Sequence, residues 1–216
     1  KKDMGGSAVV LGIAYALMSI NCPVNLRVIL PIAENSISEK SMRPLDVIYS
    51  RNKTAVEIGN TDAEGRLLLA DALTFSQEGN IKNDFIIDFA TLTGAARVAL
   101  GTELPALFTN DTSLGKMIIK EGKDQIDPMW ELPLFTPYER FLENKYDALS
   151  STGTAGTGGA ITAALFLKKF VNVDTNWAHI DLMAWNTSGR PGFPAGGEAM
   201  GLRNIVNMIV KYCNQK

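Results

Sequence analysis

Short apolar runs that alternate with helix-like stretches are the feature that most restricts the fold of this chain. The clearest run is residues 85–90, which is followed by Thr91-Leu92-Thr93-Gly94 and a helix-like segment. A short apolar run bounded by turn residues is typical of a strand in the centre of a sheet. Further strands are expected at residues 24–30, 47–49, 54–58, 104–108 and 176–182, with 47–49 and 54–58 forming a hairpin. Helices are expected at residues 7–20, 67–75, 114–121, 138–144, 160–170 and 202–212. This alternation predicts an α/β fold.

Three segments carry more specific expectations. Residues 7–20 are apolar almost all round, which predicts a helix buried on every side. Gly5-Gly6, directly before it, predicts a tight turn. Residues 150–159 (SSTGTAGTGG) predict a flexible loop, because no predicted strand leads into them and they lack the Gly-Lys-Ser/Thr ending of a phosphate-binding loop.

The composition limits the class of protein. A length of 216 residues suits one domain with a sizeable core, and a formal net charge of −2 gives no sign of a nucleic-acid partner. No apolar run reaches the roughly 20 residues that a membrane span requires. Cys22 and Cys213 lie far apart without CxxC spacing, which argues against a thiolate zinc site or a disulfide scaffold and favours a reducing, cytoplasmic setting. Since His179 is the only histidine, any metal site must use mainly oxygen ligands.

The stretch NTDAEGR, residues 60–66, holds the residues most suggestive of chemistry. Asp62, Glu64 and Arg66 occupy alternate positions, and in an extended segment their side chains would project from the same side. Crowded carboxylates repel each other unless a cation or protons neutralise them, and arginine cannot ligate a metal because it stays protonated. We therefore interpret Asp62 and Glu64 as metal ligands and Arg66 as a clamp for an anion. The alternative is a solvated turn whose acidic pair complements the dipole of the following helix.

Five stretches, in order along the chain, resemble motifs of the leucine aminopeptidase family, the two-metal cytosolic aminopeptidases. The most specific is NTDAEGRLLLAD at residues 60–71. The others are Lys2-Asp3-Met4-Gly5-Gly6, Ala90-Thr91-Leu92-Thr93-Gly94-Ala95, Gly158-Gly159-Ala160-Ile161-Thr162-Ala163 and Trp177-Ala178-His179-Ile180-Asp181. The resemblance covers nearly the whole chain, and it implies a three-layer fold like that of zinc peptidases, with a mixed β-sheet sandwiched between helices.

The resemblance implies a two-metal site. Asp3 would bind one divalent ion, Asp62 the other, and Glu64 would bridge both, with zinc or manganese as the expected ions and magnesium or cobalt as alternatives. Two such ions about 3.5–4 Å apart share a bridging water and lower its pKa toward neutrality. The implied activity is the release of N-terminal amino acids, with a leucine-type preference, from peptides.

The resemblance also implies roles for residues that do not bind metal. Arg66 would hold a bicarbonate anion near the bridging water and take part in catalysis, since a planar guanidinium grips a planar trigonal anion. Thr91, Leu92 and Gly94 would line the pocket for the first side chain of the substrate and bind its backbone. Members of the family are hexameric, so a homo-hexamer is expected.

The remaining acidic residues and the histidine are interpreted as structural. Asp71 follows Arg66 by five residues on the expected helix and faces elsewhere, and Asp88 lies in the middle of an expected strand. His179 shares one strand face with Asp181, and a lone histidine of this kind is usually a satisfied structural residue.

The sequence begins directly on the Asp3 motif. We therefore expect residues 1–216 to be a single catalytic domain that is truncated at its N-terminal side. The family site also uses two lysines and an aspartate upstream of this motif, so the chain alone is expected to bind metal weakly and to be inactive. The rival hypothesis is a non-catalytic homologue that serves as an assembly scaffold, against which the intact set of Asp3, Asp62, Glu64 and Arg66 argues.

Overall fold

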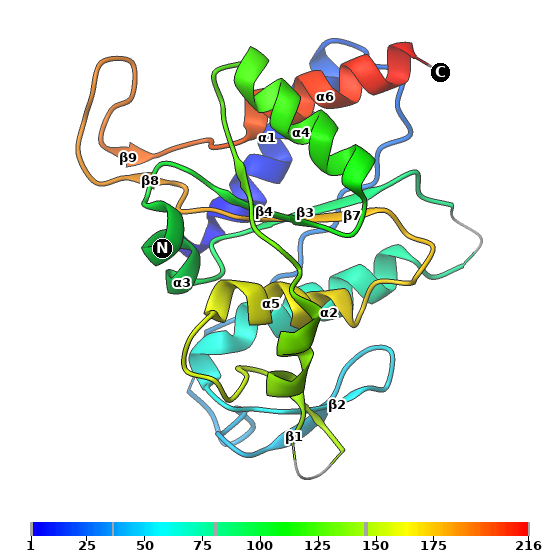
Figure 1. The fold of residues 1–216 in the computed structure, drawn as a ribbon, viewed down its shortest axis with the longest axis vertical. Helices are drawn as coiled ribbons and strands as arrows, with labels where there is room; N and C mark the ends of the chain where they lie inside the picture. Colours follow the sequence, from blue (N-terminus) through cyan, green and yellow to red (C-terminus); the bar gives the residue numbers. More distant parts are fainter. Residues whose placement is uncertain (1, 36, 80–81, 145–146, 216) are drawn as a thin grey trace. The chain divides into compact units, whose positions relative to one another are not determined.

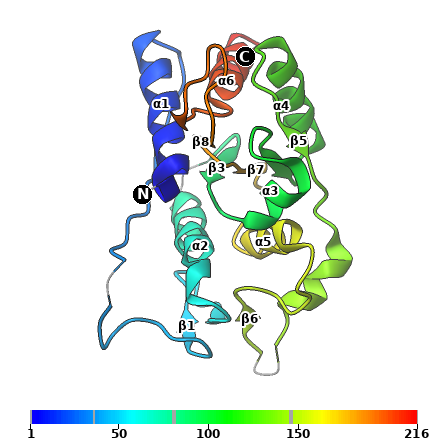
Figure 2. The ribbon, with the colours of Figure 1, turned by 90° about the vertical axis from the view of Figure 1, so that its left-hand side faces the viewer.

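The computed structural model of the protein describes residues 2–35, 37–79, 82–144 and 147–215. The chain divides into two compact units (Figures 1 and 2). The first unit consists of Lys1–Val28, Phe85–Pro133 and Asn176–Lys216, and the second consists of Ile29–Asp84 and Leu134–Thr175. The single catalytic domain expected from the sequence stays a prediction.

The first unit is built on a four-stranded mixed sheet in the order β3-β7-β4-β5. Strand β3 (Ile86–Ala90) is parallel to β7 (Trp177–Asp181), β4 (Ala106–Thr109) is antiparallel to β7, and β5 (Trp130–Glu131) is parallel to β4. The strands predicted near residues 85, 104 and 176 are therefore confirmed, and so is the α/β class with a mixed sheet.

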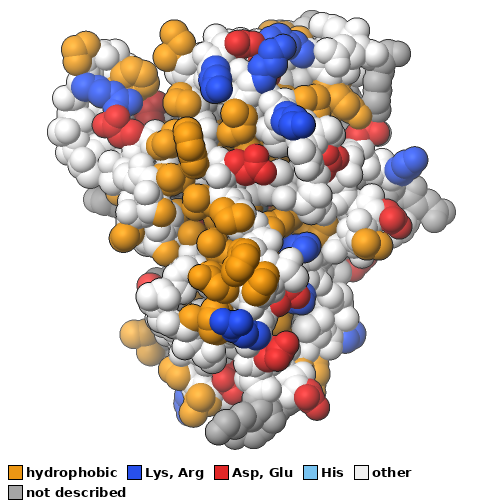
Figure 3. Space-filling view, viewed as in Figure 1, with side chains coloured by type: hydrophobic (Ala, Val, Ile, Leu, Met, Phe, Trp, Pro, Cys, Tyr) orange, Lys and Arg blue, Asp and Glu red, His pale blue; other side chains and the backbone are white. Residues whose placement is uncertain are grey.

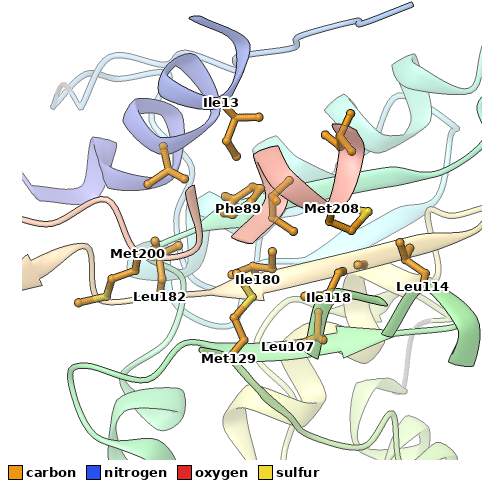
Figure 4. Packing of buried hydrophobic residues seen from close by; sticks show 14 of the residues in the cluster. Ile13, Phe89, Leu107, Leu114, Ile118, Met129, Ile180, Leu182, Met200 and Met208 are labelled. Atoms are coloured by element: carbon orange, nitrogen blue, oxygen red, sulfur yellow. The ribbon is translucent and has the colours of Figure 1, made fainter. Parts of the chain in front are cut away.

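Three helices cover one face of this sheet (Figure 1): α1 (Gly5–Ser19), α4 (Thr112–Asp124) and α6 (Leu202–Asn214). Figure 4 shows Ile13 of α1, Phe89 of β3 and Met208 of α6 within one cluster of buried hydrophobic residues. The remaining elements of this unit are η1 (Lys2–Met4), α3 (Gly94–Leu100) and the paired strands β8 (Trp185–Asn186) and β9 (Gly196–Gly197).

Helix α1 forms where it was predicted, but the expectation that it is buried on every side is wrong. Leu11, Tyr15 and Met18 are 51%, 75% and 72% exposed, while Val9 and Leu17 on the other side are buried. The sheet and α6 lie against only one side of the helix, so the apolar composition overstated its burial.

Gly5 and Gly6 were expected to form a tight turn, and instead they are the first two residues of α1. A Cβ on Gly6 would lie 2.2 Å from the carbonyl oxygen of Phe89, which is closer than any real Cβ contact. Glycine is needed here because the helix backbone approaches the end of β3. The two glycines thus fix the position of the residues just before α1, Asp3 among them.

The second unit contains a three-stranded sheet in the order β1-β2-β6. The predicted hairpin is confirmed as β1 (Val47–Tyr49) and β2 (Ala55–Glu57), which are antiparallel, and β6 (Leu149–Ser150) is parallel to β2. Its helices are η2 (Thr61–Ala63), α2 (Glu64–Ser76), η3 (Thr136–Leu142) and α5 (Gly159–Lys168). Helices α2 and α5 pack against each other.

Two local predictions are wrong. Residues 24–30, all of which the structure describes, form no strand. Strand β6 leads directly into the glycine-rich residues 150–159, where no strand was expected. A run of two residues is too short for sequence periodicity to detect, and its pairing with β2 decides it.

The described helices include none that is both long and apolar enough to cross a membrane. The face shown in Figure 3 carries basic and acidic side chains among hydrophobic ones, in keeping with the formal charge of −2.

Candidate functional site

The acidic stretch lies at the start of α2. Asn60 has an extended backbone, and its Oδ1 accepts a hydrogen bond from the N–H of Asp62 at 3.0 Å, which begins η2. Glu64 is the first residue of α2. The acidic stretch thus precedes and begins the helix that was expected from residue 67, and it is helical rather than extended. Residues two apart in a helical segment do not face each other, so the alternate spacing does not align Asp62, Glu64 and Arg66 on one side.

The carboxylates of Asp62 and Glu64 are exposed. Among the residues that the structure describes, neither carboxylate accepts a hydrogen bond or forms an ion pair. The partial positive charge at the N-terminus of α2 favours acidic groups here but does not neutralise two of them. Each of these carboxylates is therefore available to bind a cation from solution.

Arg66 is buried, with 8% of its surface exposed, and its Nη1 donates a hydrogen bond of 2.6 Å to the carbonyl oxygen of Ser151. Ser151 is fully buried, and its Oγ accepts from the N–H of Gly59 at 2.9 Å while its own N–H donates to Glu57 at 3.0 Å. Through these hydrogen bonds Ser151, which lies in the glycine-rich loop, is joined to Glu57 and Gly59 before the acidic stretch and to Arg66 at its end. Sequence reasoning missed this residue.

Gly59 carries the signal that could have revealed this contact. A Cβ at this position would lie 2.1 Å from Oγ1 of Thr152, so any larger residue would have to displace that side chain. The first residues of the predicted flexible loop are therefore held in place by β6, Gly59 and Arg66.

In the first unit, Asp3 lies in η1 with its side chain 80% exposed. Its Oδ1 accepts hydrogen bonds from Nζ of Lys2 at 3.1 Å and from Oγ1 of Thr91 at 3.3 Å. The hydrogen bond from Lys2 is the main reason that the pKa of Asp3 lies below its ordinary value, with smaller contributions from the Lys2 charge and Thr91. Asp3 is therefore ionised at neutral pH, as a metal ligand must be, and the fold joins it to Thr91, a predicted substrate residue.

The loop between β3 and α3 is organised by Asp181. This carboxylate accepts hydrogen bonds from the N–H groups of Leu92 at 3.0 Å and Thr93 at 3.1 Å, and from Oγ1 of Thr93 at 2.5 Å. Oγ1 of Thr93 also accepts from the N–H of Ala96 and so caps α3. Burial raises the pKa of Asp181, while the neighbouring His179 and these hydrogen bonds oppose the rise.

Asp181 was not predicted to support this loop. In the sheet it lies opposite Ala90, the last residue of β3, so its side chain reaches the loop that follows. Only the strand register places it there. Gly94 begins α3, and a Cβ on it would meet nothing closer than Nη2 of Arg97 at 3.6 Å.

The structural interpretation of the other polar residues agrees with their contacts. Asp88 lies opposite His179 in the sheet, with 2.5 Å between its Oδ1 and Nδ1 of the imidazole, and its Oδ2 accepts from Nε1 of Trp177 at 2.7 Å. Asp71 accepts from the N–H of Arg51 at 2.8 Å.

The chemistry of the candidate ligands suits a metal ion. Carboxylate oxygens suit hard divalent ions. Within neither unit, however, do three or more histidine, cysteine, aspartate or glutamate side chains of described residues gather to hold one. The donors therefore fit in their chemistry and charge, but in neither unit do the described residues form a complete metal site by themselves.

Comparison with known proteins gives a family. A model described as the cytosol aminopeptidase family, catalytic domain, matches residues 1–206. A probable cytosol aminopeptidase of Prochlorococcus marinus is 42% identical over 99% of this chain and 43% of its own length. One from Syntrophotalea carbinolica is 41% identical over 97% of this chain and 42% of its own length. The chain thus spans less than half the length of these curated relatives.

Solved structures of similar fold point the same way. The crystal structure of a cytosol aminopeptidase from Coxiella burnetii matches with a TM-score of 0.93 and 48% identity, over 98% of this chain and 46% of the other. The bottromycin maturation enzyme BotP in complex with Mn matches with a TM-score of 0.93 and 35% identity, over 99% and 48%. A tomato leucine aminopeptidase mutant matches with a TM-score of 0.86 and 36% identity, over 97% and 41%.

Proposed function

This chain belongs to the cytosol aminopeptidase family, and on that basis we propose that it is a metal-dependent aminopeptidase that removes N-terminal amino acids from peptides. The observation that carries the proposal is the exposed pair Asp62 and Glu64, whose carboxylates have no partner among the described residues. Exposed acidic side chains at a helix start also occur as solvated caps, and the match to the cytosol aminopeptidase family favours a bound cation here.

The proposed ligands are Asp3 for one ion, Asp62 for the other and Glu64 for both. Zinc or manganese is the proposed metal, and the manganese in the related BotP structure supports the latter. When bound, the ions supply a water of lowered pKa and positive charge for the scissile carbonyl. The lowered pKa of Asp3 keeps this ligand ionised at neutral pH.

The remaining site residues are proposed to handle an anion and the substrate. Arg66 holds bicarbonate, and its hydrogen bond to Ser151 fixes the orientation of the guanidinium plane. Thr91, Leu92 and Gly94 bind the first residue of the peptide. A leucine-type preference is supported by the likeness to the tomato leucine aminopeptidase. The proposal also includes a homo-hexamer in the cytoplasm.

The decisive experiment replaces Glu64 by alanine in the full-length protein. Hydrolysis of leucine p-nitroanilide with added Mn²⁺ or Zn²⁺ is expected to fall by several orders of magnitude, because the bridging ligand is lost. Glu39→Ala is the matched control, since Glu39 is also an exposed glutamate of the second unit and lies outside the proposed site. Equal rates in both variants would refute the assignment of Glu64.

A binding measurement separates metal ligation from catalysis. Titration with Mn²⁺, followed by electron paramagnetic resonance, should show weaker or fewer bound ions in Asp62→Asn than in Glu39→Ala. The scaffold hypothesis makes the opposite prediction. A scaffold would show no turnover in the unmodified protein, and its oligomeric state in light scattering would not depend on metal.

A further inference from the structure

The two cysteines, far apart in sequence, are neighbours in the first unit. Cys22 follows α1, Cys213 lies in the last turn of α6, and these two helices pack against each other. Both are free and half-buried, and both pack at the edge of the same hydrophobic cluster. Sequence spacing gave no sign of this pairing, because about 190 residues separate the two positions.

Cys22 is held by the end of α1. Its N–H donates to the carbonyl oxygen of Leu17 at 3.0 Å, and the N–H of Asn21 donates to that of Met18 at 3.1 Å. Asn21 has a positive φ of 50°. This combination is a Schellman motif, in which a left-handed residue closes the helix. Pro23 follows and restricts the backbone on the other side of Cys22.

Cys213 is held by α6. It lies in the last turn of that helix, next to Tyr212, whose ring packs edge-on against Phe85 with 5.1 Å between centroids. Helices α1 and α6 pack against each other, and Figures 1 and 2 both show the coil after α1 running beside the C-terminal end of α6. Two well-fixed backbones thus hold the two cysteines at the edge of one hydrophobic cluster, beside the packed helices α1 and α6.

We propose that Cys22 and Cys213 are a modification site that forms an intramolecular disulfide with a low-molecular-weight disulfide such as oxidised glutathione. One thiolate attacks the reagent and releases one reduced thiol as leaving group, and the second cysteine then displaces the other. The protein loses two protons and two electrons, and the reagent is reduced to two thiols. The product bonds the end of α1 to α6.

The position of the proposed disulfide indicates which elements it would hold together. Asp3 precedes the N-terminal end of α1, whereas Cys22 follows its C-terminal end. The disulfide would therefore join α1 to α6 at the end of α1 opposite to the proposed metal ligand. Burial and the adjacent Cys213 raise the pKa of the Cys22 thiol, so it stays protonated at neutral pH and reacts slowly.

The test treats the folded chain with oxidised glutathione, blocks any remaining thiols with an alkylating agent and measures the intact mass. We expect a mass about 2 Da below that of the reduced protein, without an adduct. Trypsin digestion without a reducing agent should release peptides 3–27 and 212–216 joined by the disulfide. The oxidised protein should also unfold at a higher temperature than the reduced protein, because the closed loop restricts the unfolded chain.

Single-cysteine variants provide the control. Cys22→Ser and Cys213→Ser should each gain one glutathione, about 305 Da, because the resolving thiol is missing. Glutathione adducts or disulfide-linked dimers as the main product of the unmodified chain would overturn the proposal. So would an internal disulfide that forms only in denaturant. The unmodified chain decides the outcome even if a variant fails to fold.

Discussion

Thr93 is bound to Asp181 twice, once through its backbone and once through its side chain. Its N–H lies 3.1 Å from each carboxylate oxygen, and its hydroxyl donates to Oδ2 at 2.5 Å. Asp181 is 2% exposed and belongs to β7, while Thr93 precedes α3. The buried carboxylate of Asp181 on β7 therefore fixes the loop after the neighbouring strand β3, and that loop carries the proposed substrate residues.

We expect Asp181→Asn to destabilise the first unit by about 1–3 kcal/mol, because the amide group places N–H donors against the donors of Leu92 and Thr93. Urea unfolding at neutral pH measures the loss. Asp174→Asn, at an exposed position, is the control and should change little. If the two variants are equally stable, Asp181 does not hold the loop.

Gly6→Ala and Gly94→Ala form a matched pair at two helix starts. Alanine at position 6 would place its Cβ 2.2 Å from a backbone oxygen, so we expect the free energy of unfolding to fall by about 1–3 kcal/mol. Alanine at position 94 meets only a side-chain nitrogen at 3.6 Å, so the fold should be retained. Thermal unfolding compares them. A rise in KM of the stable Gly94 variant would support its proposed contact with substrate, and an unchanged KM would count against it.

Arg66→Lys tests the proposed anion clamp. Lysine keeps a positive charge but lacks the planar fork that grips bicarbonate, so we expect a fall in kcat and the loss of any activation by added bicarbonate. Arg43→Lys, an exposed control in the same unit, should behave like the unmodified protein. A bicarbonate response that survives in the Arg66 variant would assign the anion to another residue.

Asp111 predicts a pH dependence of stability. Its Oδ1 accepts hydrogen bonds from the hydroxyl and N–H of Ser113 and from the N–H of Leu114, at 2.6, 2.7 and 3.1 Å, and so caps α4. The hydroxyl of Ser113 is the main reason that the pKa of Asp111 lies below its ordinary value of 3.8, and the two backbone N–H groups add to it. The ionised cap thus stabilises the fold fully above 3.8, and this contribution is lost as the pH falls through the lowered pKa.

We therefore expect Asp111→Ala to cost about 1 kcal/mol at pH 7. Asp111→Asn should cost less, and its difference from the unmodified protein should vanish below the pKa window. Guanidinium unfolding between pH 2 and pH 7 checks this, and a difference that stays constant down to pH 2 would contradict it.

The amino-acid sequence by itself determined the order of most strands and helices, the α/β class and the family. These features can be read from the sequence because apolar periodicity and glycine-containing motifs are patterns of a few neighbouring residues. It also located Asp62 and Glu64 at a helix start, since the helix pattern begins directly after them.

Only the tertiary structure decided which distant residues support one another. Asp181 meets Thr93 through the parallel register of β3 and β7, and Arg66 meets Ser151 through the short strand β6. The packing of α1 on α6 brings Cys22 and Cys213 to one hydrophobic cluster. The exposed side of α1 was likewise decided by which elements cover it. Contacts across such separations depend on register and packing geometry, which no local spacing of residue types encodes.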